Sequence, residues 1–309
     1  MNRFAPGDPR RATLAQALLY ITPAIWSANF IVARLAVGVV EPHLLALLRW
    51  TMASAMMLPL ALPGLRRHWP QWRSEWKDLL LMGALGMWIC GAFVYIGAAS
   101  TPAVNIGLLY ATAPVLIAVG SALWLGERLN KRQIFGVALA LSGTTMIVVK
   151  GSLDNLLAFR LNVGDLWIIA SVLSWATYSL LLRGRASVLD PFARLTAIAL
   201  GGVIVLIPFT LAEMALTGAP KPSVAMFTLA FVAALLPGFL SYQAYSFMQR
   251  ELGVARTALV MYLSPIYAAL VAWAILGEAP QWFHGAGALL ILPGIYLATR
   301  TPAKITPRG

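Results

Sequence analysis

Long apolar stretches alternate with short polar segments along the whole chain. A helix needs about 20 mostly apolar residues to span a bilayer, and windows of that size predict ten transmembrane helices. The connections between them are short and contain charged residues or proline. The predicted spans cover residues 14–33, 43–63, 78–98, 103–124, 133–149, 164–183, 191–213, 224–248, 254–276 and 282–299. This pattern predicts an all-α integral membrane protein.

The basic residues of the connections are unevenly distributed between the two sides of the membrane. With a cytoplasmic N-terminus, 18 of the 23 Lys and Arg residues fall on the cytoplasmic side, as the positive-inside rule requires. An even number of spans then places both termini in the cytoplasm. The first apolar stretch is too long for a signal peptide, so we expect it to be retained as a helix.

The composition supports a membrane protein and argues against other classes. Hydrophobic residues make up 60% of the chain and charged residues 11%, whereas soluble domains have about 25% charged residues. The formal charge of +12 is spread over short clusters rather than a dense basic block, so we expect no nucleic-acid partner. The single cysteine, Cys90, allows no intramolecular disulfide.

A stretch of the first half of the chain recurs in the second half. Residues Leu108 to Gly143 align with Leu259 to Gly294 at a constant spacing of 151 residues. The first and sixth spans align more weakly at a spacing of 149, through Trp26 with Trp175 and Arg34 with Arg183. The identities that composition alone does not explain pair Pro114 with Pro265, Gly126 with Gly277, Glu127 with Glu278, Gly136 with Gly287 and Gly143 with Gly294. The chain is therefore a duplication.

The duplication predicts two inverted halves, residues 1–149 and residues 150–309, the second with a cytoplasmic C-terminal tail. Each half contains five spans, an odd number, so the second half enters the membrane upside down relative to the first. Inverted repeats around a central cavity are the architecture from which alternating access follows. Glu127 and Glu278 then lie at helix ends on opposite surfaces, where we expect structural rather than proton-carrying roles.

Each half contains a mid-helix proline followed by a helix-terminal Leu-Gly-Glu. Together with the segment from Trp26 to Arg34, this repeated element resembles the drug/metabolite transporter superfamily. Within it, the chain is similar to the ten-helix EamA-type exporters and looks like the bacterial aromatic amino-acid exporters. The resemblance covers nearly the whole chain. It implies export of amino acids or similar metabolites through a central cavity in a bacterial inner membrane.

Polar and aromatic residues at helical spacing mark the faces that we expect to line this cavity. Such residues avoid lipid because an unpaired hydroxyl or amide in hydrocarbon is unfavourable. The alternative is ordinary packing between helices. The predicted lining comprises Thr22, Trp26 and Asn29, Trp88 and Tyr95, Ser171, Trp175 and Tyr178, and Tyr242, Gln243 and Tyr245. Trp69, Trp72, Trp76, Trp124 and Trp282 lie near helix ends and are interpreted as interfacial anchors instead.

Pro114 and Pro265 are candidates for a gating hinge, because a mid-helix proline removes a backbone donor and frees a carbonyl. Plain curvature is the alternative. The predicted lining suits a zwitterion better than a multiply charged anion. Arg49 is the one basic residue that falls at membrane depth, and we expect it to extend to the outer interface. The acidic residues fall in loops or at helix ends, which favours facilitated diffusion over proton coupling.

No enzymatic motif or metal-ligand spacing is present, so we predict a transporter without cofactor or metal rather than an enzyme. The expected partners are a small-molecule substrate and the lipid bilayer, and the expected state is a monomer. The leading hypothesis is a facilitative exporter of aromatic or neutral amino acids. The alternatives are a broader drug or metabolite exporter and an intramembrane enzyme or sensor without transport.

Overall fold

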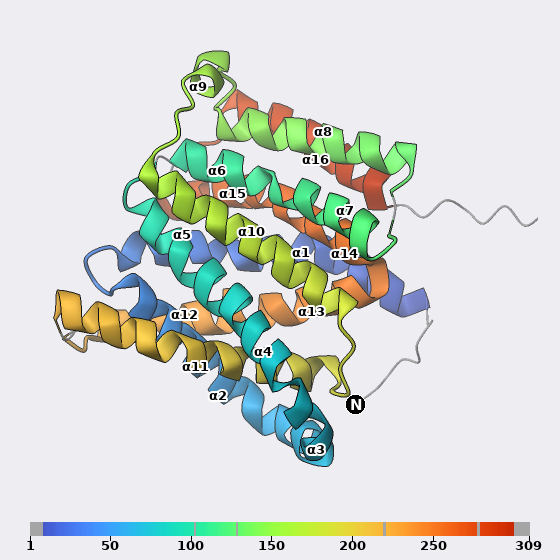
Figure 1. Ribbon diagram of the computed structural model, residues 1–309. Coiled ribbons are helices and arrows are strands. Elements are labelled where there is room, and N and C mark those ends of the chain that lie inside the picture. The colour runs from blue at the N-terminus through green and yellow to red at the C-terminus, as the bar shows by residue number, and fades with distance from the viewer. Residues whose placement is uncertain (1–8, 102, 128, 219–220, 277–278, 300–309) are drawn as a thin grey trace, which may run out of the picture.

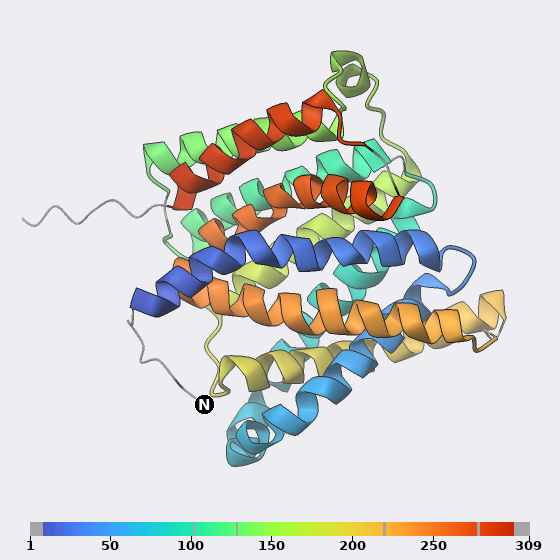
Figure 2. The same ribbon diagram turned by 180° about the vertical axis from the view of Figure 1, so that it is seen from behind.

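The computed structural model describes residues 9–101, 103–127, 129–218, 221–276 and 279–299, and this part of the chain contains helices and connections but no β-strand. The long helices lie side by side, with their connections gathered at two ends (Figures 1 and 2). The first-half helices are α1 (Pro9–Ala36), α2 (Pro42–Arg67), α3 (Trp69–Trp72), α4 (Trp76–Gly83), α5 (Cys90–Ala98), α6 (Ala103–Ala111), α7 (Ala113–Trp124) and α8 (Lys131–Val148). A 3-10 turn, η1 (Arg73–Glu75), precedes α4, and a π-helical segment, η2 (Ala84–Ile89), joins α4 to α5.

The second half repeats this order of elements. A second π-helical segment, η3 (Ala234–Leu240), joins α12 to α13, and a 3-10 segment, η4 (Leu259–Leu263), joins α14 to α15. The helices are α9 (Leu153–Leu157), α10 (Val163–Gly184), α11 (Pro191–Thr217), α12 (Val224–Ala233), α13 (Ser241–Leu252), α14 (Val254–Ala258), α15 (Ser264–Leu276) and α16 (Trp282–Thr299).

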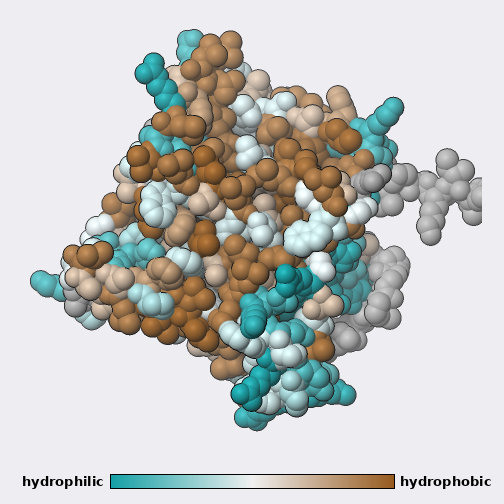
Figure 3. All heavy atoms as spheres, in the orientation of Figure 1, coloured by the Kyte–Doolittle hydropathy of each residue, from teal (hydrophilic) through white to brown (hydrophobic). Residues whose placement is uncertain are grey.

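Within the described residues, eight helical stretches are long and apolar enough to cross a membrane, and a shorter apolar helix covers Val254–Leu270. The remaining predicted span corresponds to α8, which begins with the polar sequence Lys131, Arg132, Gln133 and is the partner of α16. The ten predicted spans therefore each have a helical counterpart. Hydrophobic residues cover much of the face in Figure 3, whereas hydrophilic residues gather toward the ends of the helices.

The two halves are inverted relative to each other. In Figure 1, α1 and α2 run in the opposite direction to their counterparts α10 and α11. The contact between α8 and α16 shows the same relation: a Cβ atom on Gly136 would lie 2.5 Å from the Gly294 carbonyl oxygen, and one on Gly143 would lie 2.6 Å from that of Gly287. The repeat aligns Gly136 with Gly287 and Gly143 with Gly294, so a two-fold axis exchanges these two antiparallel contacts.

Local sequence explains where the helices begin. Asn130 and Gln133 form a reciprocal capping box at the start of α8, and Asn162 and Asp165 form one at the start of α10. Asp190 accepts hydrogen bonds from the backbone N–H groups of the first turn of α11. These caps place α10 and α11, which carry much of the buried interior, in a defined register.

Candidate functional site

A cluster of aromatic side chains occupies the middle of the molecule. The Trp26 ring of α1 lies 5.3 Å from the Trp175 ring of α10 and 5.7 Å from the Tyr245 ring of α13, measured between centroids. Tyr242 lies 5.6 Å from Trp175, and Tyr178 lies 5.5 Å from it. All five side chains belong to the predicted cavity lining. Most of the ring pairs are tilted or edge-to-face, an arrangement that aromatic quadrupoles favour.

Trp26 and Trp175 lie on the axis that relates the two halves. The sequence repeat pairs these two residues, and two positions that are equivalent by a two-fold rotation can touch only near the rotation axis. Their contact therefore places the aromatic cluster where both halves meet.

The π-helical segment η2 contacts the cluster through two carbonyl groups that accept hydrogen bonds from side chains of other helices. The Tyr242 hydroxyl donates to the Gly86 carbonyl oxygen over 2.9 Å, and the Ser174 hydroxyl donates to that of Leu85 over 2.8 Å. A Cβ atom on Gly86 would lie 2.9 Å from the Tyr178 ring, so glycine gives this ring its space. Helices α10 and α13 are thereby fastened to the irregular turn of the third span.

Two predicted lining residues, Asn29 and Tyr95, lie together next to the cluster. The Tyr95 hydroxyl donates to the Asn29 amide oxygen over 2.9 Å, and this oxygen also accepts from the Arg49 guanidinium over 3.3 Å. Trp50, which follows Arg49 on α2, contacts the Tyr242 ring at 4.9 Å. A polar group of α1, α2 and α5 thus adjoins the aromatic cluster.

Sequence reasoning was wrong about the direction of Arg49. We expected its side chain to extend to the outer interface, but the residue is 5% exposed and its guanidinium lies over the Trp50 ring, 5.1 Å from the centroid. The Asn29 amide draws it inward. Because the direction of a side chain depends on the helix that packs against it, no single stretch of sequence carried this signal.

The other predicted lining residues are dispersed around the cluster. The Ser171 hydroxyl is hydrogen-bonded to the Tyr110 hydroxyl at 2.8 Å, and Thr22 is fully buried with no partner for its hydroxyl among the described residues. The Trp88 ring stacks on Phe209 at 3.7 Å, so it packs between the third and seventh spans instead of joining the cluster. The Gln243 amide lies near the Met57 sulfur atom.

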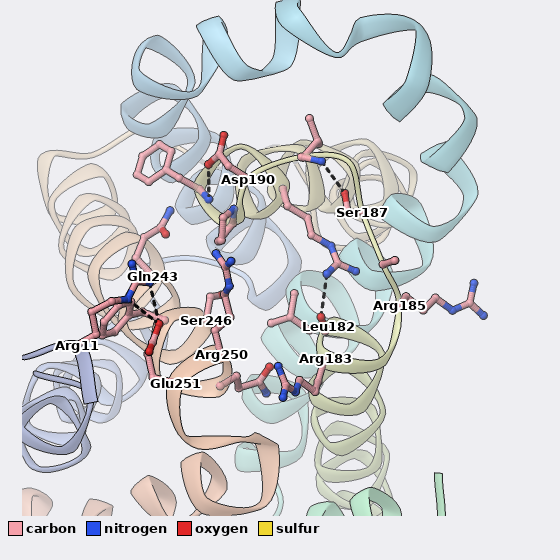
Figure 4. Close-up of a pocket in the computed structure, with 17 residues that line it drawn as sticks. Arg11, Leu182, Arg183, Arg185, Ser187, Asp190, Gln243, Ser246, Arg250 and Glu251 are labelled. Carbon is pink, nitrogen blue, oxygen red and sulfur yellow. Dashed lines mark hydrogen bonds and ion pairs between the residues drawn. The ribbon is translucent and has the colours of Figure 1, made fainter. Parts of the chain in front are cut away.

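A pocket of about 1120 Å³ opens beside the cluster, and we call it the vestibule. Gln243 and Ser246 of α13 line it, and their chain neighbours Tyr242 and Tyr245 belong to the aromatic cluster. Figure 4 shows residues of α13 facing residues of the connection between α10 and α11 across the vestibule. The vestibule therefore shares helix α13 with the aromatic cluster.

The vestibule wall is rich in arginine, and three of its five arginines are ion-paired with carboxylates. Its charged residues are Arg11, Arg183, Arg185, Arg194 and Arg250, with Asp190 and Glu251 as the acidic members. Arg11 pairs with Glu251 at 2.8 Å, whereas Arg194 donates to the Leu182 carbonyl oxygen. Figure 4 shows Arg11 and Glu251 together on one side of the pocket, and Arg183 and Arg185 on the other. Such a surface attracts anionic or carboxylate-bearing molecules.

The predicted hinge prolines follow interruptions of two spans. The fourth span breaks at Thr112, between α6 and α7, and Pro114 lies in the first turn of α7. The ninth span contains the 3-10 segment η4, and Pro265 is the second residue of α15. Both interruptions lie at equivalent positions of the repeat. Whether these prolines act as hinges stays a prediction.

Glu127 connects three spans at the end that carries the vestibule. One carboxylate oxygen accepts from the Arg183 guanidinium over 3.0 Å, and the other accepts from the Val254 backbone N–H over 3.0 Å, at the start of α14. Gly253 precedes it with a φ of 85°, a conformation that favours glycine. These contacts agree with a structural role at the helix end. Its repeat partner, Glu278, lies outside the described residues.

Four of the five tryptophans interpreted as interfacial anchors are exposed at the ends of helices. The exposed fractions of Trp69, Trp76, Trp124 and Trp282 are all above one half. Trp72 is half-buried and donates its indole N–H to the Leu65 carbonyl oxygen. In the described part of the chain, no group of three or more His, Cys, Asp or Glu side chains is arranged to hold a metal ion.

The duplication in this chain corresponds to a known family. The profile of the EamA-like transporter family matches the chain twice, over residues 13–149 and again over residues 162–300. The chain belongs to the EamA-like transporter family. It is thus a multi-pass membrane protein of the drug/metabolite transporter superfamily, and membership implies a small-molecule substrate.

Relatives of this chain are named transporters and exporters. A protein of Streptantibioticus cattleyicolor, named a "probable terminal-alkyne amino-acid exporter", is 30% identical over 91% of this chain and 92% of its own length. A "probable amino-acid metabolite efflux pump" of Salmonella typhimurium is 26% identical over 91% of this chain and 93% of its own. An uncharacterized transporter of Archaeoglobus fulgidus is 29% identical over 91% and 96%. A solved crystal structure with 21% identity shares the fold, with a TM-score of 0.72 over 92% of this chain and 97% of that one.

Proposed function

We propose that this protein exports neutral and aromatic amino acids, or close analogues, across the bacterial inner membrane by alternating access. The observation that carries the proposal is the contact between the repeat-related rings of Trp26 and Trp175, 5.3 Å apart near the axis between the two halves. An aromatic substrate side chain can replace such ring contacts, because stacking among flat apolar groups is interchangeable. Two relatives named as exporters of amino acids or their metabolites agree with this substrate class.

In this mechanism the halves 1–149 and 150–309 rock against each other about the axis through the cluster. The vestibule faces the cytoplasm if both termini are cytoplasmic, so the substrate enters from inside the cell. Interruptions next to Pro114 and Pro265 absorb the change in helix direction. The described carboxylates that form hydrogen bonds or ion pairs bind arginines, amides or backbone groups outside the cluster, which supports facilitated diffusion over proton coupling.

Efflux from proteoliposomes tests this function. Vesicles that contain the purified protein are loaded with radiolabelled phenylalanine, leucine or lysine, and efflux is measured with and without a pH gradient. We expect efflux of phenylalanine and leucine that does not require the gradient. Efflux of none of these amino acids above protein-free vesicles overturns the proposed substrate, and efflux only with a gradient overturns facilitated diffusion.

Tryptophan variants connect the flux to the cluster. Trp26→Ala and Trp175→Ala should each lower phenylalanine efflux by about tenfold or more, because truncation of a central aromatic contact typically costs more than about 1.4 kcal/mol. Trp124→Ala is the matched control, since this ring is 59% exposed at a helix end. Equal loss in all three variants would argue against the cluster as the substrate site.

A further inference from the structure

Arg49 is a buried cation with no ionic partner among the described residues. It is 5% exposed, and it forms no ion pair with any carboxylate among the described residues. Its Nη1 atom donates to Asn29, while its Nε atom is buried with no hydrogen-bond partner in the same part of the chain. An unpaired charge at this depth is strongly unfavourable unless a function retains it. Arg49 therefore needs an anionic partner that the described protein atoms do not supply.

The carboxylates of the described residues that form hydrogen bonds or ion pairs do so away from Arg49. Glu127, Glu213 and Glu251 bind Arg183, His43 and Arg11, in that order. The remaining engaged groups are Glu75 with Ser187 and Val188, Asp78 with Arg185, Asp165 with Asn105 and Asn162, and Asp190 with the first turn of α11. Glu41 and Asp154 are exposed. No described acidic side chain is thus placed to pair with a substrate ammonium group at the aromatic cluster.

The surroundings of Arg49 are those of a mixed aromatic and polar site. Its guanidinium lies over the Trp50 ring, and Trp50 contacts Tyr242 of the aromatic cluster. A guanidinium combines stacking on an aromatic face with a planar fork that matches a carboxylate. A molecule whose apolar ring packs against the cluster could therefore place a carboxylate beside the Arg49 guanidinium.

Arg49 has no basic counterpart at the equivalent position of the second half. Helices α2 and α11 are equivalent in the repeat, and both begin at a proline, Pro42 and Pro191. Counted from these prolines, the residue of α11 equivalent to Arg49 is Ile198. The vestibule, with its several arginines, opens next to α10 and α13 in the other half. A carboxylate that enters past the basic vestibule would thus meet a second cation across the aromatic cluster.

We propose that Arg49 binds the carboxylate of the transported molecule, and that the substrates are monocarboxylates with a flat or apolar side chain, recognised without a requirement for the amino group. This inference rests on the proposed export function and deepens it. It predicts that 3-phenylpropanoate, which has the carboxylate but no amine, competes with phenylalanine. Phenethylamine, which has the amine but no carboxylate, should not compete.

The first measurement is ligand binding to the purified full-length protein in detergent, followed by its thermal unfolding midpoint. Phenylalanine and 3-phenylpropanoate should both raise the midpoint, and phenethylamine should leave it unchanged. Because this readout needs no flux, it separates the two proposals. Stabilisation by 3-phenylpropanoate without phenylalanine efflux would overturn amino-acid export and retain the role of Arg49. Equal stabilisation by the amine, or none by either carboxylate, would overturn the role of Arg49.

Variants separate carboxylate recognition from a purely structural contribution of Arg49. Arg49→Gln should weaken competition by 3-phenylpropanoate about tenfold or more, since a charge-assisted pair is lost. Arg49→Lys, which keeps the charge, should recover part of the affinity and also serves if the glutamine variant folds poorly. Arg132→Gln, at the exposed start of α8, is the matched loss of one positive charge and should bind normally. Unchanged competition in folded Arg49→Gln protein, or equal competition by 3-phenylpropanoate and phenethylamine in folded Arg49→Lys protein, would overturn the proposal.

Discussion

At the scale of single residues, two buried tyrosines differ in what their hydroxyl groups bind. The Tyr242 hydroxyl donates to the Gly86 carbonyl oxygen, whereas the Tyr262 hydroxyl has no partner in the described structure. Tyr242→Phe should therefore destabilise the protein by about 1 kcal/mol, because it removes a buried hydrogen bond to the π-helical segment. Tyr262→Phe should be neutral or stabilising, since it removes an unpaired polar group. Unfolding of the purified variants in detergent measures both, and equal losses would contradict this account.

The positions of some residues of the candidate site could be predicted from the sequence, whereas those of others could not. Trp26 and Trp175 were predictable, because the repeat aligns them and helical spacing puts both on polar faces. Arg49 and Trp88 were not, since each is oriented by a partner on another span, Asn29 for the first and Phe209 for the second. Periodicity identifies the face of a helix, whereas the neighbouring helix determines what that face contacts.

At the scale of elements, hydropathy predicted the position of the spans but not their irregular turns. The π-helical segments η2 and η3 lie at equivalent positions, yet only η3 contains a proline, Pro237. In η2, the Leu85 and Gly86 carbonyl groups accept hydrogen bonds from side chains of α10 and α13, which lie far away in sequence. No local sequence pattern predicts these tertiary contacts.

The pairing of α8 with α16 depends on glycine at the crossing. A Cβ atom on Gly143 would lie 2.6 Å from the Gly287 carbonyl oxygen and 2.8 Å from the Leu290 Cβ atom. Gly143→Ala should force these helices apart and destabilise the protein by about 1–3 kcal/mol. Gly285→Ala on α16 is the control, because nothing lies within 4 Å of its added Cβ atom, and helix propensity favours alanine by about 1 kcal/mol. Thermal unfolding midpoints compare the two, and a loss only in Gly285→Ala would refute the proposed crossing.

At the scale of the whole molecule, the two-fold relation holds for the helices but not for the surface. The vestibule opens at the end where α10 finishes and α11 begins, and its wall is rich in arginine. An inverted repeat has an equivalent path at the opposite end, lined by the corresponding parts of the first half. A structure open at one end is therefore one of two related states, and the membrane orientation decides which side of the cell this state faces.

Single-cysteine labelling decides that orientation. Cys90 is the chain's one cysteine, so Cys90→Ala gives a background into which Arg132→Cys and Lys221→Cys can be placed separately. Both positions are exposed, and Arg132 lies at the vestibule end, whereas Lys221 lies in the connection between α11 and α12 at the other (Figure 1). With cytoplasmic termini, a membrane-impermeant maleimide should label Lys221→Cys in intact cells and Arg132→Cys only after permeabilisation. The reverse pattern would place the vestibule outside the cell, so this structure would then be the outward-open one of the two states.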